Sequence, residues 1–137
     1  MATKYTSRIE TKKAYWSFAP SVLIAIGIAI ASLWEDPQMP EAMEVSDALL
    51  HGIMYIFFAA SLTIPILYLY PARAITYIYT CAVSTAYGAL MELLQYLCTE
   101  TRTASMEDMY GNLGGSMLGV ALSAVCREMF LDEGSKE

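Results

Sequence analysis

The sequence predicts an all-α protein, an integral membrane four-helix bundle with short loops and both termini in the cytoplasm. Of its 137 residues 56% are hydrophobic and 16% are charged, and the mean hydropathy is +0.42, which is too apolar for an ordinary soluble domain. Four apolar stretches span about residues 15–34, 48–70, 74–98 and 109–130. Each approaches the ~20 residues that a helix needs to cross the hydrocarbon core. A soluble bundle is the alternative, but too few polar residues remain to cover its surface.

The first stretch is expected to be a retained helix of a single domain that covers residues 1–137. Trp16 and Trp34 bracket it, and roughly 27 Å of helix between them suits an aromatic belt at each interface. A cleaved signal peptide is the alternative, because basic residues precede the stretch and Ala29-Ile-Ala31 resembles a cleavage site. The full span length and the closing Trp favour the retained helix.

The other three stretches contain residues that predict how the helices meet. Pro65 indicates a kink in the second, which neighbouring helices could accommodate. The short link at residues 71–73 makes the second and third helices antiparallel neighbours. The fourth has small residues at every fourth position, which favours close helix packing in lipid: Gly111, Gly115, Gly119 and Ser123.

Charge is distributed unevenly along the chain. Seven of the eight basic residues fall on one side of a four-span arrangement, and only Arg102 falls on the other. The loop between the first two stretches contains acidic residues and no Lys or Arg. The positive-inside rule therefore places both termini in the cytoplasm and both acidic loops outside. No basic stripe is present, so nucleic acid is not expected as a partner.

Polar residues recur at helical spacing inside three of the apolar stretches. Ionisable groups in such segments are costly and by default indicate a functional site. Spacings of three and four residues keep each set on one helical face, and alternating helix directions bring the sets to similar depths, in a polar pocket open to the outside. The predicted ligand-binding residues are Asp47, His51, Tyr55, Glu92, Gln95, Arg102, Asp108 and Asn112.

Some of these residues also have structural interpretations: hydrogen bonding at a helix end for His51, interaction with the helix dipole for Asp47 and Asp108, and interhelical hydrogen bonding for Asn112. Glu92 is hardest to explain in this way, because an ionised carboxylate two turns deep needs a partner or stays protonated. Arg102 is its natural counter-ion, with His51 as the alternative. Taken together, the set favours a site.

Metal and cofactor binding are not predicted. Cys81, Cys98 and Cys126 lie in the apolar stretches without metal-like spacing and are expected to be buried free thiols. No grouping of Asp and His along the sequence indicates a metal site. No serine or cysteine of the polar set is an evident nucleophile.

The whole pattern resembles the VanZ-like family of small bacterial membrane proteins. The resemblance covers about residues 47–119 and rests on Asp47-Ala-Leu-Leu-His51-Gly-Ile-Met-Tyr55, Glu92-Leu-Leu-Gln95, Arg102 and Asp108-Met-Tyr-Gly-Asn112-Leu-Gly-Gly115-Ser-Met-Leu-Gly119. Family members often have a Lys after the first Asp, where this chain has Ala48. The resemblance implies a multi-pass protein of the bacterial cytoplasmic membrane. For some relatives it implies resistance to glycopeptide antibiotics, particularly teicoplanin.

Two functions remain open. In the first, the pocket binds an amphiphile of the outer leaflet, either a lipid, a lipid-linked cell-wall precursor or a lipoglycopeptide, with Tyr55 and Tyr96 as aromatic surface and Arg102 at an anionic head group. In the second, the protein is an intramembrane enzyme that acts on a lipid head group or an acyl or phosphoryl group. Its candidate catalytic residues are His51 and Glu92 as a general base and its orienting partner, and Arg102 as a stabiliser of negative charge. Binding is favoured, and a homo-oligomer is compatible with either function.

The charge pattern generates a topology prediction. Residues 35–46 and 99–107 should lie outside the cell. The test introduces single cysteines into a chain without the three native ones and adds a membrane-impermeant thiol reagent to intact cells. The reagent should label Glu41→Cys and should not label Arg73→Cys. Labelling of Arg73→Cys but not Glu41→Cys would contradict the assignment.

Overall fold

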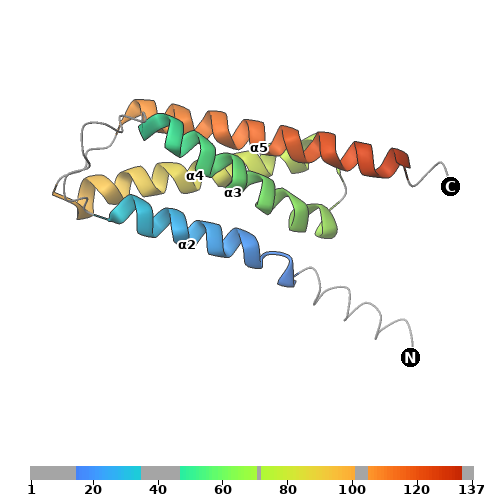
Figure 1. Cartoon of the computed structure of the whole chain (residues 1–137), viewed down its shortest axis with the longest axis horizontal. Coiled ribbons are helices and arrows are strands. Elements are labelled where there is room, and N and C mark those ends of the chain that lie inside the picture. The colour runs from blue at the N-terminus through green and yellow to red at the C-terminus, as the bar shows by residue number, and fades with distance from the viewer. Residues whose placement is uncertain (1–14, 35–46, 71, 101–104, 134–137) are drawn as a thin grey trace.

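The chain folds as a set of four helices without strands in the part that the structure describes. A computed structural model describes residues 15–34, 47–70, 72–100 and 105–133. The helices are α2 (Ala19–Leu33), α3 (Asp47–Leu69), α4 (Ala74–Cys98) and α5 (Met106–Glu133) (Figure 1). The predicted all-α class is confirmed. The predicted bounds match α3 and α4 closely, while α2 begins later than predicted, because residues 17 and 18 form a turn before Pro20.

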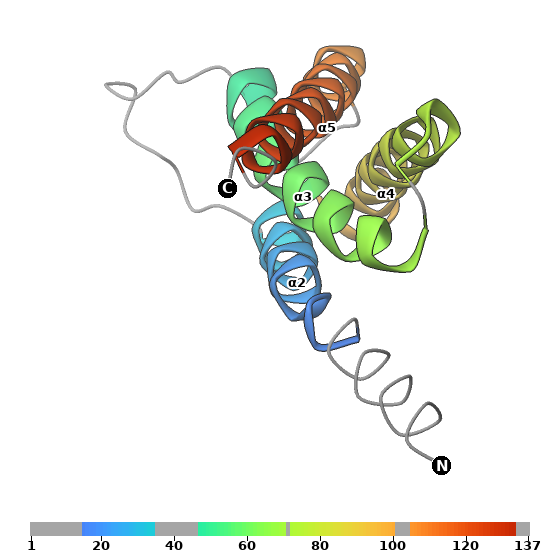
Figure 2. The ribbon, with the colours of Figure 1, turned by 90° about the vertical axis from the view of Figure 1, so that its right-hand side faces the viewer.

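Successive helices run in alternating directions. α3 and α5 form the largest interface, α4 packs against both, and α2 packs against α3 and α4. The end-on view shows α2 and α5 on opposite sides of α3 (Figure 2). α2 and α4 end, and α3 and α5 begin, at the same end of the bundle. The predicted antiparallel pairing of the second and third helices is confirmed.

The small-residue stripe of α5 lies directly against the backbone of α3. A Cβ atom added to any of its three glycines would collide with a main-chain carbonyl oxygen of α3: that of Ala48 for Gly111, of Gly52 for Gly115 and of Ile56 for Gly119. Both sets advance by four residues, so the contact follows one ridge along each helix. The predicted role of the stripe in close packing is confirmed.

α2 is attached to its neighbours by side chains that donate to main-chain carbonyl oxygens. Pro65 inside α3 has no N–H for the carbonyl of Ser61, and the Ser21 hydroxyl of α2 donates to that oxygen at 2.8 Å. From α4, the Tyr87 hydroxyl donates to the Ala25 carbonyl at 2.7 Å. The predicted accommodation of Pro65 by a neighbouring helix is therefore confirmed.

Many of the buried side chains are polar, and many large apolar side chains are exposed. The buried polar residues are Ser21, Ser32, His51, Thr63, Thr76, Thr80, Ser84, Glu92, Gln95, Asn112 and Ser116. The exposed large residues include Leu23, Ile26, Phe57, Ile64, Ile78, Leu93, Leu118 and Leu122. The buried apolar residues are Ile28, Tyr55, Phe58, Ala59, Ile66, Met91 and Val120. So many exposed large apolar side chains are unusual for a soluble domain.

Two of the described helices are long and apolar enough to cross a membrane. The qualifying segments are Asp47–Leu67 of α3 and Met106–Met129 of α5, and α2 is a shorter apolar helix. α4 is not among these segments, and its buried face contains the polar residues Thr76, Thr80 and Ser84. A membrane crossing by all four helices stays a prediction.

The cysteines differ in part from their predicted state. All three are free, but Cys98 and Cys126 are exposed and only Cys81 is partly buried. The expectation of burial is wrong for the two exposed residues, because they lie on outward helical faces where apolar residues are also exposed. Apolar composition alone does not tell which face of such a helix is buried.

The contact between α3 and α5 generates a prediction for a matched pair of glycines. Gly115→Ala should lower the melting temperature, because overpacking typically costs about 1–3 kcal/mol. Gly114→Ala is the control, since its Cβ would meet no atom within 4 Å, and the higher helix propensity of Ala should leave its stability equal or greater. Thermal unfolding in detergent, followed by circular dichroism, measures both. Equal melting temperatures would show that α5 does not approach α3 this closely.

Candidate functional site

A group of polar side chains lies between α3, α4 and α5 at the end of the bundle where α3 and α5 begin. We call His51, Tyr55, Glu92, Asp108 and Asn112 the polar cluster. The exposed fractions of His51, Glu92 and Asn112 are 6%, 3% and 1%, whereas Asp108 is partly exposed. Three successive helices therefore bring ionisable groups together inside the bundle.

Glu92 lies between a side chain of α3 and the first turn of α5. Its Oε1 is 3.3 Å from His51 Nδ1, and its Oε2 accepts a hydrogen bond of 3.2 Å from the main-chain N–H of Ser105. The amino-terminal end of a helix carries partial positive charge, which favours a carboxylate there. These contacts explain how a carboxylate is held at this depth, and they support the alternative partner, His51.

Ser105 is a functional residue that sequence reasoning missed. Its Oγ accepts hydrogen bonds from the main-chain N–H groups of Glu107 and Asp108, at 3.1 and 3.4 Å, and so caps α5. The Ser-x-x-Asp pattern of residues 105–108 is the signal that could have identified this cap. Through its N–H, the same residue positions the Glu92 carboxylate.

Three residues of the polar cluster offer metal-ligand atoms close to one another. One atom from each of His51, Glu92 and Asp108 lies within 4.8 Å of the other two. The sequence predicted no metal site, because the three residues come from different helices and share no ligand spacing. Metal-ligating potential is thus a property of the tertiary structure.

Asn112 and Tyr55 lie deeper and have unused hydrogen-bonding capacity. Both are 1% exposed, and neither the Asn112 side-chain amide nor the Tyr55 hydroxyl has a hydrogen-bond partner among the described residues. Asn112 fits against α4 only because residue 88 is glycine, since a Cβ there would lie 2.8 Å from Asn112 Nδ2. Buried polar groups are seldom left unpaired, so these atoms have hydrogen-bonding capacity for a water molecule or a polar ligand. Tyr55, being buried, does not offer the aromatic surface that was expected of it.

Two predicted site residues lie outside the polar cluster, and a third is not among the described residues. Asp47 is exposed at the first position of α3, outside the polar cluster. Gln95 is buried, but its Nε2 donates to the Ser32 carbonyl at 3.0 Å and thereby holds the end of α2. Arg102 lies outside the described residues, so its pairing with Glu92 stays a prediction.

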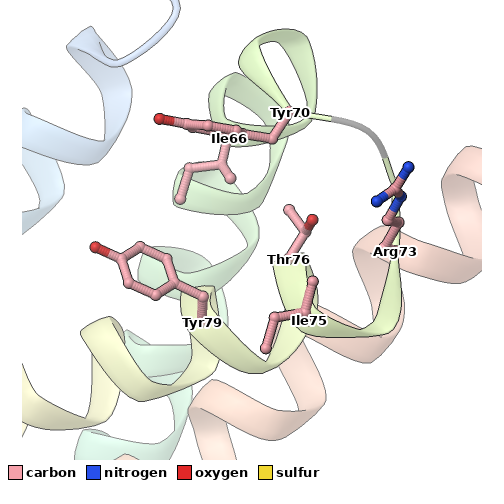
Figure 3. A pocket seen from close by; sticks show the side chains of 6 residues that line it. All are labelled: Ile66, Tyr70, Arg73, Ile75, Thr76 and Tyr79. Atoms are coloured by element: carbon pink, nitrogen blue, oxygen red, sulfur yellow. The ribbon is translucent and has the colours of Figure 1, made fainter.

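A separate cavity lies at the opposite end, where α3 meets α4. It has a volume of about 470 Å³ and is lined by Ile66, Tyr70, Arg73, Ile75, Thr76 and Tyr79 (Figure 3). None of the predicted site residues lines it. Its wall is mostly apolar, as expected for a gap between two helices at a hairpin.

The chain was compared with families of proteins, curated proteins and solved structures. No family model, curated protein or solved structure matches the chain. The resemblance to the VanZ-like family stays a prediction that rests on the motifs.

The contacts of Glu92 generate a stability prediction. Glu92→Leu should destabilise the fold, because the partly buried N–H of Ser105 loses its acceptor, at a cost of about 1 kcal/mol or more. Glu92→Gln retains an acceptor oxygen and should be less destabilising. Glu107→Leu is the control, since Glu107 is exposed. Denaturant unfolding in mixed micelles measures the free energy of unfolding of wild type and of each of the three variants. A Glu92→Leu variant as stable as wild type would show that this contact does not hold α5.

Proposed function

We propose that this chain is a VanZ-like multi-pass protein of the bacterial cytoplasmic membrane that binds the polar head group of an amphiphile at the polar cluster. The amphiphile is an outer-leaflet lipid, a lipid-linked cell-wall precursor or a lipoglycopeptide such as teicoplanin, which connects the protein with glycopeptide resistance. The observation that carries the proposal is the unpaired hydrogen-bonding capacity of Asn112 and Tyr55, both almost fully buried.

The distribution of apolar side chains supports a membrane setting. Large apolar residues cover the outside of all four described helices, and lipid is the solvent in which such a surface is stable. Trp16 and Trp34, near opposite ends of the bundle, are 78% and 65% exposed, as expected for residues that anchor at the two interfaces.

The basic residues support an outward-facing polar cluster. Arg73 precedes α4, and Arg127 lies near the end of α5. Both therefore lie at the end opposite the polar cluster. By the positive-inside rule that end faces the cytoplasm, and a ligand of the polar cluster comes from the outer side.

The chemistry of the polar cluster suits a head group that both donates and accepts hydrogen bonds. The Asn112 amide offers a donor and an acceptor, and the Tyr55 hydroxyl offers either. The acyl chain of an amphiphile would lie along exposed apolar residues near this end, such as Leu93 and Tyr96. A ligand with one polar and one apolar part matches this combination.

Catalysis is the second candidate, favoured by the 3.3 Å contact between His51 Nδ1 and Glu92 Oε1. A histidine beside a carboxylate can act as a general base on a bound water or hydroxyl group. The polar cluster contains no serine or cysteine, so water would be the nucleophile in a hydrolysis of the head group.

The binding proposal is tested with purified protein in lipid nanodiscs. The titrants are teicoplanin, a polyprenyl-diphosphate-linked sugar and an anionic phospholipid, with a glycopeptide that lacks an acyl chain as a negative control. At least one amphiphile should bind saturably. Asn112→Leu should lower the affinity for that amphiphile about tenfold or more, and a tenfold loss is equivalent to ~1.4 kcal/mol.

Leu113→Ala, an exposed neighbour, is the control and should bind as wild type does. Full binding by both Glu92→Gln and His51→Ala would mean that the polar cluster is structural. Where wild type raises teicoplanin tolerance in a sensitive host, the same variants should lose that effect.

A further inference from the structure

The donor atoms of the polar cluster form a set that metal ions recognise. His51 supplies an imidazole nitrogen from α3, Glu92 a carboxylate oxygen from α4 and Asp108 a carboxylate oxygen from α5, all within 4.8 Å of one another. Each helix contributes one donor, so the bundle holds the three from different directions. Such convergence is what a metal site needs and what a set of solvated surface carboxylates lacks.

The distances are compatible with coordination. Metal–ligand bonds of about 2.0–2.2 Å place two tetrahedral ligand atoms roughly 3.3–3.6 Å apart. The 3.3 Å between His51 Nδ1 and Glu92 Oε1 already meets this condition. One Asp108 oxygen lies within 4.8 Å of a donor atom of His51 and of a donor atom of Glu92, so a shift of about 1 Å, which a side-chain rotation supplies, would bring it to coordination distance.

The burial of His51 and the missing hydrogen bond at its Nδ1 are an independent indication of a ligand. The residue is more than nine-tenths buried, and its Nδ1 lies 3.3 Å from Glu92 Oε1 but makes no hydrogen bond within the part of the chain that the structure describes. When a neutral imidazole is protonated at Nε2, its Nδ1 has a lone pair that can bind a metal ion. A neutral imidazole with a free lone pair is the form that ligates metals.

Charge balance favours a dication. Two carboxylates and a neutral histidine would together have a charge of −2, and a bound metal ion is the largest local charge in such a site. A divalent cation brings the total to zero. We propose that His51, Glu92 and Asp108 bind one divalent transition-metal cation, with zinc as the ion that this donor set suits best.

The ligand types distinguish among cations. Imidazole suits zinc and other transition metals, whereas magnesium and calcium prefer sites built of oxygen alone. Three protein ligands also leave a coordination position open, as in sites where zinc binds water or a substrate. The Asn112 side chain, one turn beyond Asp108 and without a hydrogen-bond partner, is suited to orient a group at that position.

The test uses the full chain in detergent without an affinity tag of histidines, and zinc alone as the probe. The native cysteines are replaced by serine so that thiols do not contribute. After removal of metal with a chelator, competition with a fluorescent zinc indicator should give one saturable site per chain. Elemental analysis of the reloaded protein should give one zinc ion.

Single substitutions identify the ligands. Asp108→Asn should weaken zinc binding by more than about 100-fold, because the loss of an outer-shell partner alone costs about 10–100-fold. His51→Gln should do the same. Asp47→Asn is the matched control, an exposed aspartate at the same end of the bundle and outside the polar cluster, and it should bind zinc as wild type does. Circular dichroism confirms that each variant is folded.

A second readout does not depend on affinity. Cobalt(II) in place of zinc should give visible absorption bands that differ between wild type and Asp108→Asn at saturating cobalt.

The absence of a saturable zinc site in folded wild-type protein would overturn the inference, and so would equal zinc affinity in Asp108→Asn and Asp47→Asn. This inference goes beyond head-group binding, and the titrations contain no phospholipid, cell-wall precursor or lipoglycopeptide. A protein that binds zinc and no amphiphile would therefore overturn only the proposed function.

Discussion

The close approach of α5 to α3 is the constraint on which the rest of the structure depends. Gly111 and Gly115 place the backbone of α5 against the carbonyl groups of Ala48 and Gly52. His51 lies in the same turn of α3, and Asn112 follows Gly111 in α5. The glycines thus fix the distance and the register at which the two polar faces meet. A larger side chain in the stripe would separate the helices and with them the donor atoms of the polar cluster.

Hydrogen bonds donated by side chains join the helices of this bundle to one another. Ser84 and Ser116 join α4 to α5 at 2.8 Å, and Ser21, Tyr87 and Gln95 join α2 to its neighbours through main-chain carbonyl groups. In lipid, helices gain little from apolar contact with one another, because lipid tails are equally apolar. Small residues and polar side chains then decide which helices associate.

Glu92 connects this architecture to the site. Its carboxylate accepts from the N–H of the residue that caps α5 and lies beside His51 of α3. One side chain of α4 therefore contacts both partner helices at the end where they begin. The same arrangement that stabilises a buried carboxylate also leaves one of its oxygens directed toward His51 and close to Asp108. Structural support and ligand-binding capacity come from the same residue.

The sequence by itself determined the helical class, the approximate bounds of α3 and α4, and the residues that form most of the polar cluster. These features depend on local periodicity, which places His51 with Tyr55 and Asp108 with Asn112 on single helical faces whatever the partners are. Gln95 shows the limit of that reasoning. It shares a face with Glu92, yet it hydrogen-bonds to α2, because helical spacing gives the direction of a side chain and not the neighbour that it meets.

Only the tertiary structure decided which donors converge and which atoms are left unpaired. Asp47 has the same spacing from His51 as Asn112 has from Asp108, but it is exposed at the start of its helix. The three potential metal ligands lie on three helices, and their proximity depends on the depth at which α3 and α5 interlock through glycine. That depth is set by contacts between residues more than 50 positions apart, which no pattern within one helix contains.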